Sequence, residues 1–510
     1  MRRPRQTLTV LFTLLFAACA ASPSDADGPE PVSAPEASAA KEPAWRVTIE
    51  VDAAEQLARV RATLGPLPES DVPDAVDFAF ARRFAFVTLP PAFVEPPVAW
   101  SIDKTLDIDR TDPFRLRVET EGRRDLELTY AIALNQRTHP EVVAGTDQYE
   151  HSFVTADQGM LFTAELVPSP DVALDTVEVR FAGDHASSVI TPWTARSMDG
   201  SRPESADVDR VWTPRRSELG DDIVLLGEGW RTIEAEARGL QATFALHPDA
   251  AWLAPLAEEI FVPIVEAEVD LFERAPRERY LFVFGPADGV RGYGGSPKTG
   301  SMTLFAASNL PEFQARQGLA HLIAHEFHHV FGRTGARSSD DLRFVTEGYT
   351  DYYAYIVPWR LGMIDDASLH KRLERKISEG AQALAKYQQS LALAGGPEFF
   401  AGREAYQACY AAGLTLALWT DLALRKAKAG TLDELMREWY APGDANQRSL
   451  RAWRETLTER LRAADALAYM NAVETVDEID WEELFDRVNI VVEQVGDSFQ
   501  VSPTVIDRIR

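Results

Sequence analysis

The sequence predicts a multidomain α+β protein: an N-terminal β-sandwich, then a small sheet with a long helix, and a helical C-terminal part. At 510 residues the chain exceeds the roughly 250–300 residues at which a single hydrophobic core stops growing. Short segments with apolar residues at every second position recur between residues 45 and 246. From about residue 250 the apolar spacing becomes mainly helical.

The overall composition is that of a globular protein and argues against one class of partner. Apolar residues make up 45% of the chain and charged residues 26%. The net charge is −27, and no basic stripe is visible in the sequence. Nucleic-acid phosphates are bound by clustered lysine and arginine, so we expect no nucleic acid as a partner.

Residues 1–19 have the form of an export signal. Three arginines in the first five residues precede an apolar run over 8–18, which is too short for an ordinary membrane span. The run ends in Leu-Phe-Ala-Ala-Cys at 15–19, which resembles the lipobox of bacterial lipoproteins. That resemblance implies lipidation of Cys19 and a place in the bacterial cell envelope, facing the periplasm or exterior. The membrane is then contacted through this anchor only. The alternative is an ordinary secretory peptide cleaved near the same position.

The next segments are predicted to be a flexible tether and a domain of strands. Residues 20–44 are rich in Pro, Ala, Ser and acidic residues, a composition that cannot bury enough surface to order itself. Alternating patterns then predict strands at 45–51, 114–118, 126–134, 177–181 and 240–246. We assign 45–245 to a β-sandwich domain, which contains no catalytic cluster.

Residues 246–510 are expected to form a second domain. Helical spacing over 250–273 is followed by a buried strand at 279–285 and by a strand at 301–306. We expect the strand at 301–306 to lie at an edge of its sheet, where an extended peptide could pair with it. Nearly everything beyond is predicted to be helical.

A helix predicted over 309–332 carries the residues that suggest chemistry. His325 and His329 are four residues apart, so they project from the same face and can bind one metal ion. Two imidazoles suit zinc, and a carboxylate commonly completes a catalytic site while one position stays open for water. Glu326, next to the first histidine, is the candidate general base.

A second helical segment, at 346–353, supplies the carboxylates. Glu347 lies eighteen positions after His329 and is the predicted third ligand. Asp351, one turn later, is the candidate to accept a hydrogen bond from a ligand imidazole. We expect this helix to end before Pro358.

These motifs resemble those of a known group of enzymes. His325–His329 followed by Thr-Glu-Gly-Tyr-Thr at 346–350 resembles the glutamate-zincins (gluzincins), and most of all the glycyl aminopeptidase family, which is similar to the leucine aminopeptidase and leukotriene hydrolase group. The likeness extends to Tyr-Gln-Ala-Cys-Tyr-Ala-Ala-Gly at 406–413 and Thr-Leu-Asp-Glu-Leu-Met-Arg at 431–437. It implies a thermolysin-like catalytic domain, one zinc ion per chain and an oxyanion-stabilising role for Tyr410, with Tyr406 as second candidate.

The activity implied is zinc-dependent hydrolysis of a peptide or protein substrate by a metal-activated water. Two departures from the family leave its specificity open. The family's glutamate that holds the substrate's free amine has no counterpart in 293–302, and Ala412 replaces a lysine. Aminopeptidase and endopeptidase activities therefore remain alternatives. A third is a catalytically weak or inactive envelope binding protein that retains the peptidase fold.

Other residues near the motifs have structural interpretations. His321 and His328 are expected to support the ligands or to pack, and not to bind metal. Cys409 is expected to be a small buried apolar residue, since no histidine or acid partner argues for a nucleophile.

Overall fold

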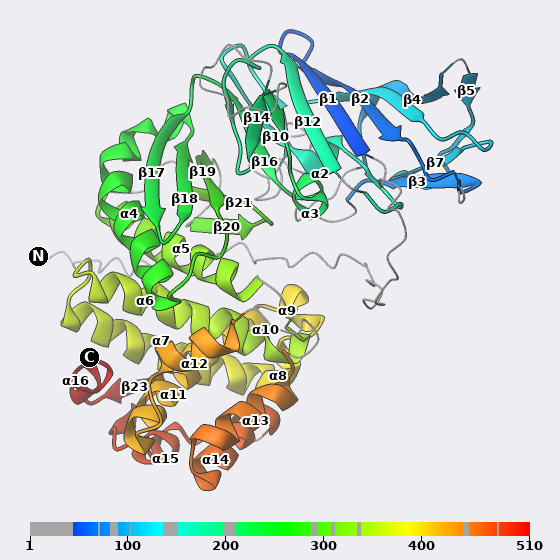
Figure 1. Ribbon diagram of the computed structural model, residues 1–510. Coiled ribbons are helices and arrows are strands. Elements are labelled where there is room, and N and C mark those ends of the chain that lie inside the picture. The colour runs from blue at the N-terminus through cyan, green and yellow to red at the C-terminus, as the bar shows by residue number, and fades with distance from the viewer. Residues whose placement is uncertain are drawn as a thin grey trace, which may run out of the picture. The chain divides into compact units, whose positions relative to one another are not determined.

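The structure is a computed structural model that describes residues 44–69, 72–81, 90–102, 104–135, 151–174, 176–197, 210–287, 293–307, 312–333, 338–441, 448–476 and 479–510. Figure 1 shows the helices and strands of these residues and labels most of them. The signal segment, the lipidation site expected at Cys19 and the tether up to residue 43 lie outside them. None of the described helices combines the length and the apolar character that crossing a bilayer requires.

The described residues form two compact units. The first contains the described residues up to Ile233, Ala242–Ala254 and the described part of Arg279–Asn309. The second contains Glu234–Gln241, Pro255–Glu278 and the described residues from 312 onward. This division differs from the boundary expected at 245/246. The strands after residue 279 join the first unit because Leu281 and Val283 share a core cluster with Phe153 and Leu225.

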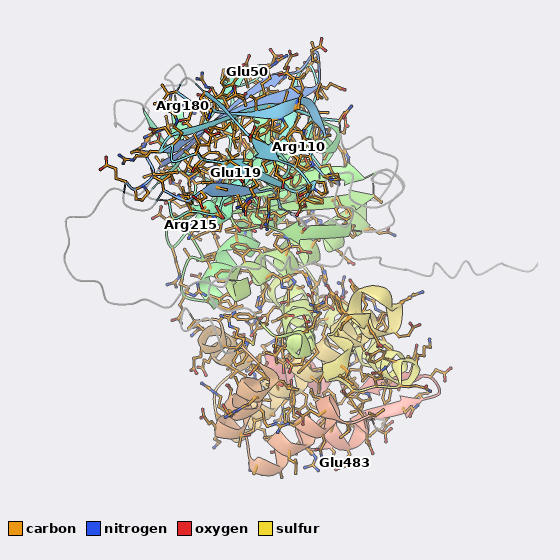
Figure 2. The ribbon with its side chains drawn as sticks, turned by 90° about the vertical axis from the view of Figure 1, so that its right-hand side faces the viewer. Glu50, Arg110, Glu119, Arg180, Arg215 and Glu483 are labelled. Atoms are coloured by element: carbon orange, nitrogen blue, oxygen red, sulfur yellow. The ribbon has the colours of Figure 1, made fainter. Side chains whose placement is uncertain are left out.

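An eight-stranded sheet dominates the first unit, in the order β14-β15-β12-β1-β2-β8-β4-β5. Its strands are β1 (Ala44–Asp52), β2 (Leu57–Gly65), β4 (Phe93–Ser101), β5 (Lys104–Leu106), β8 (Leu126–Ala133), β12 (Thr176–Gly183), β14 (Ala195–Ser197) and β15 (Arg210–Trp212). In β1, Trp45 and Ile49 are buried whereas Glu50 is exposed, as the alternating pattern predicts. Figure 2 labels Glu50 and, on the parallel neighbour β12, Arg180.

Two four-stranded sheets share a core with this large sheet. Their orders are β13-β16-β10-β9 and β11-β3-β7-β6. Their strands are β3 (Ala75–Ala79), β6 (Ile108–Asp109), β7 (Arg115–Glu119), β9 (Phe153–Val154), β10 (Gln158–Phe162), β11 (Ser169–Pro170), β13 (Val189–Ile190) and β16 (Ile223–Gly227), with short helices α2 (Thr163–Leu166) and α3 (Arg216–Leu219). One hydrophobic cluster joins the three sheets through residues such as Trp45, Phe78 and Leu161. Burial of these faces holds the layers together.

A five-stranded sheet has the order β17-β18-β19-β21-β20. Its strands are β17 (Arg231–Ala237), β18 (Leu240–Leu246), β19 (Arg279–Ala287), β20 (Tyr293–Pro297) and β21 (Ser301–Ala307), and η3 (Pro248–Leu253) follows β18. The expectation that 301–306 lies at a sheet edge is wrong. β21 pairs in parallel with β19 on one side and antiparallel with β20 on the other, so the hairpin places β20 at the edge.

The second unit is almost entirely helical, which confirms the predicted helical C-terminal part (Figure 1). Its elements are α4 (Ala254–Leu271), α5 (Glu312–Arg333), η4 (Asp340–Leu342), η5 (Phe344–Tyr349), α6 (Thr350–Arg360), α7 (Asp366–Tyr387), α8 (Leu391–Ala394), α9 (Glu398–Ala401), α10 (Arg403–Gln407), η6 (Ala408–Ala412), α11 (Gly413–Ala427), α12 (Leu432–Trp439), α13 (Leu450–Arg460), α14 (Ala463–Glu474), α15 (Trp481–Asp486) and α16 (Thr504–Ile509), with the hairpin β22 (Val492–Val495) and β23 (Ser498–Val501). Capping side chains mark the start of several of these helices. The Asp365 side chain, for example, accepts a hydrogen bond from Ser368 N at the start of α7.

The helix expected to stop before Pro358 continues to Arg360 as α6. Every residue of α6 up to Trp359 is buried, so packing outweighs the one backbone hydrogen bond that proline removes. The beginning of this segment also differs from the expected α-helix, because residues 344–349 form the π-helix η5.

Candidate metal centre

Three predicted ligands from two elements of the second unit come together at one point. His325 and His329 lie one turn apart on α5, with their Nε2 atoms 3.2 Å from each other. Glu347 lies on the π-helix η5, and its Oε2 atom is 3.8 Å from His325 Nε2 and 3.5 Å from His329 Nε2. Among the described residues, these three form the group of donor atoms arranged as a metal site would require.

The donor set fits a zinc ion in both chemistry and size. Two donors bound to one tetrahedral zinc at about 2.0–2.1 Å lie about 3.3–3.4 Å from each other. The edges of 3.2, 3.5 and 3.8 Å fall around that value, and the circle through the three atoms has a radius of about 2.0 Å. Glu347 Oε2 is buried and has no hydrogen-bond partner among the described residues. A buried carboxylate oxygen of this kind is costly unless a cation compensates it.

Electrostatic interactions within the centre lower the pKa of Glu347 and raise that of His325. Burial by itself would raise the pKa of Glu347, but the charge of His329 and the contacts with both histidines hold this pKa well below its usual range. Burial would lower the pKa of His325, yet Glu347, Glu326 and Asp351 together raise it. The Glu347 carboxylate is therefore ionised, as a metal ligand must be, whereas His325 has to release a proton when it binds a metal ion.

The candidate base and the candidate oxyanion donor both adjoin His325. Glu326 follows it on α5 and is 2% exposed. Tyr410, on the π-helix η6, is buried, and its ring stacks on the His325 ring with centroids 5.7 Å apart at an angle of 15°. The ring of Tyr406 packs on that of Tyr410, with ring centroids 4.5 Å apart. The ring of Tyr410 thus contacts a predicted ligand.

Asp351 has a different nearest partner from the expected one. Its Oδ1 atom lies 2.8 Å from His321 Nε2 but 3.9 Å from His325 Nδ1, which is too long for a hydrogen bond. His321, one turn before the ligand on α5, takes the place next to the carboxylate. The other oxygen, Oδ2, lies 3.1 Å from Lys376 Nζ on α7. Asp351 thus acts on the ligand at longer range, within a buried cluster of Asp351, His321 and Lys376.

Several residues of the centre's surroundings were missed by sequence reasoning. Lys376 is 7% exposed and stands among the buried apolar residues of α7, and this charge on an apolar helix face was the signal that could have found it. Behind α5, His328 Nδ1 lies 3.1 Å from Glu268 Oε2, and the His328 ring stacks on Tyr353 at 4.6 Å. His328 therefore packs, as expected. Its neighbour Glu268 is a carboxylate that no local sequence pattern predicts.

Cys409 is free and fully buried beside Tyr410. Burial, and then the charge of Glu347, raise the pKa of its thiol well above the usual range. A thiol kept in its neutral form is a poor nucleophile, which agrees with the interpretation of Cys409 as a small apolar residue.

Comparison with known proteins gives matches at the level of structure. No family model matches the sequence, and no curated protein sequence matches it. An aminopeptidase N family protein from Idiomarina loihiensis is 18% identical, with a TM-score of 0.66 over 88% of this chain and 79% of that chain. A two-domain M1 zinc metallopeptidase, solved as a mutant with L-tryptophan bound, is 14% identical, with a TM-score of 0.50 over 86% of this chain and 95% of that chain. The chain has the fold of these proteins.

Proposed function

We propose that this protein is a zinc metallopeptidase that hydrolyses peptide bonds with an activated water molecule. The observation that carries the proposal is the triangle of His325 Nε2, His329 Nε2 and Glu347 Oε2, whose edges suit one zinc ion. The shared fold with an aminopeptidase N family protein and an M1 zinc metallopeptidase supports it.

Each residue has a role in the proposed reaction. When bound, a zinc ion supplies a Lewis acid and lowers the pKa of a coordinated water towards about 7. Glu326 takes a proton from the attacking water and passes it to the nitrogen of the leaving amine. The hydroxyl of Tyr410 donates a hydrogen bond to the oxyanion that forms when water adds to the carbonyl. The C–N bond then breaks, leaving a carboxylate and an amine.

We propose further that cleavage does not require a free N-terminus on the substrate. A bound ammonium group in a partly desolvated cleft needs an opposite charge. The sequence over 293–302 contains no glutamate, and its one charged residue is Lys298. Lys298 is buried, and its Nζ donates a hydrogen bond to Ser296 Oγ on the adjoining strand β20. This hydrogen bond lies within the β20–β21 hairpin. Peptides acetylated at the N-terminus should be cut at least as fast as free ones, and strict dependence on a free amine would refute this point.

The proposed location is the bacterial cell envelope, with the protein anchored through lipid on Cys19 and acting on peptides or proteins there. The lipobox-like sequence at 15–19 supports the anchor. This part of the proposal is independent of the chemistry at the metal centre.

The catalytic proposal is tested by metal analysis and hydrolysis together. The purified protein should contain one zinc per chain and hydrolyse a panel of peptides, and 1,10-phenanthroline should abolish turnover until zinc is restored. The matched control is Glu326→Gln, which keeps the three ligands and should keep zinc while losing about 10²-fold or more in kcat. Zinc present without hydrolysis of any peptide or protein substrate would reject the peptidase assignment. Loss of zinc from Glu326→Gln would show that Glu326 is a ligand and not the base.

A further inference from the structure

Two short π-helices carry residues of the proposed centre. Glu347 lies on η5 and Tyr410 on η6. A π-helix is rare, occurs mostly as a single turn inside an α-helix, and is frequently found at functional sites. The relative position of η5 and η6 therefore sets where the tyrosine stands with respect to a metal ligand.

The backbone of η5 touches the start of α11, the helix that directly follows η6, at a pair of glycines. A Cβ placed on Gly348 would lie 2.4 Å from Gly413 Cα, and one placed on Gly413 would lie 2.3 Å from Phe344 O. Neither distance is possible for a real side chain, and the opposing atoms belong to the backbone. Only glycine at both positions allows this approach. Gly348 directly follows Glu347, and Gly413 begins α11 three residues after Tyr410.

A third glycine, Gly380 on α7, lies against the last residue of η6. A Cβ placed on Gly380 of α7 would lie 2.8 Å from Ala412 N and 2.9 Å from Ala412 Cα. Ala412, the residue that replaces the family's lysine, is fully buried. The backbone at Ala412 and Gly413, where η6 passes into α11, is thus in direct contact with α7 and with η5, with no side chain between the main chains.

We propose that Gly348, Gly380 and Gly413 are positioning residues for Tyr410, which form a backbone joint that fixes the tyrosine hydroxyl relative to the metal ligands. The inference rests on the proposed function, because it concerns the same reaction. Tyr410 itself contacts the reacting atoms, whereas the three glycines act through it. Glycine is needed at these positions because it has no side chain. Adding a single methyl group, as in a glycine-to-alanine substitution, should therefore displace Tyr410.

The size of the disturbance follows from the distances. Ordinary contact begins at about 3.4 Å, so alanine at position 380 needs roughly 0.6 Å more room and alanine at position 413 roughly 1.1 Å. A misplacement of about 1 Å can lower a rate about 10²-fold. Gly380→Ala should therefore lower kcat by about 10-fold and Gly413→Ala by about 100-fold. Neither substitution removes a metal donor, so zinc content should stay at one per chain.

The experiment compares Gly380→Ala, Gly413→Ala and a control, Gly396→Ala, each also combined with Tyr410→Phe. The control adds a Cβ whose one close neighbour is Leu393 O at 3.3 Å, outside the joint. In the Tyr410→Phe background, Gly380→Ala should change kcat less than 3-fold, because a residue that acts through the hydroxyl has nothing left to position. A purely structural role would instead lower kcat equally in both backgrounds, and that result would overturn the proposal.

A second measurement does not depend on activity. With 3-fluorotyrosine incorporated at position 410 of the zinc-free protein, Gly380→Ala should move the 19F resonance further than Gly396→Ala does. An unchanged resonance together with an unchanged kcat would refute the joint. If Gly413→Ala fails to fold, as a thermal melt would reveal, Gly380→Ala carries the test alone. Failure of the proposed function can be told apart from failure of the joint. If the protein is not a peptidase, the wild type has no turnover, but the 19F resonance still shows whether Gly380→Ala displaces Tyr410.

Discussion

Replacing Lys376 by methionine tests whether the buried ion pair between Lys376 and Asp351 stabilises the protein. Lys376 and Asp351 are 7% and 1% exposed, and Nζ lies 3.1 Å from Asp351 Oδ2. Burial would lower the pKa of Lys376, but the charge of Asp351 raises it above its usual range, so the pair is ionised. Methionine keeps the apolar stem and removes the charge. Asp351 is then left buried with His321 as its remaining close neighbour.

The expected loss is large for a single substitution. At an effective dielectric constant of about 20, two unit charges 3.1 Å apart attract by about 5 kcal/mol. Breaking a buried pair by removing one partner costs about 3–5 kcal/mol. His321 stays 2.8 Å from the other carboxylate oxygen, so part of the interaction of Asp351 with its surroundings is kept. We therefore expect Lys376→Met to lower the free energy of unfolding by about 3 kcal/mol.

Urea denaturation of the zinc-free protein measures this change without interference from metal loss. The matched control is Lys371→Met, at an exposed lysine of the same helix, which should stay within about 0.5 kcal/mol of wild type. The double variant Lys376→Met with Asp351→Asn removes both charges and should recover about 2 kcal/mol of the summed single losses. Additive losses, or a Lys376→Met variant as stable as the control, would mean that this ion pair does not stabilise the fold.

Three further predictions concern single residues. His329→Ala should lose most of the bound zinc, as measured by metal analysis after dialysis, and near-normal zinc would remove this histidine from the ligand set. Tyr410→Phe should keep zinc and lower kcat by about 10²–10³-fold, the usual effect of removing one oxyanion donor, and a kcat within 3-fold of wild type would exclude that role. Cys19→Ala should abolish incorporation of a labelled fatty acid in bacteria and release the protein from the membrane fraction. Continued labelling would place the lipid elsewhere.

Much of the fold follows from local patterns. The strand over 45–51 and the helix of α5 were both expected, because alternation of period two and apolar spacing of three or four are set by neighbouring residues alone. Local rules failed where packing overrode them. α6 continues through Pro358, and 301–306 became an inner strand, since the order of strands depends on how a hairpin folds back.

For the centre, local sequence patterns were enough to predict the three donors that the structure brings together. His325 and His329 share a face through helical geometry, and Glu347 stands at the spacing that the resemblance to the gluzincins implies for a third ligand. The surroundings of Asp351 could not be predicted from residue spacing: its close neighbours are His321 and Lys376, and the predicted ligand His325 lies farther away. The close backbone approach at Gly348, Gly380 and Gly413, on which the proposed joint rests, is likewise visible only in the folded chain. Periodicity specifies the direction in which a side chain points from its own element. Contacts between elements depend on chain topology and close packing, which local sequence does not encode.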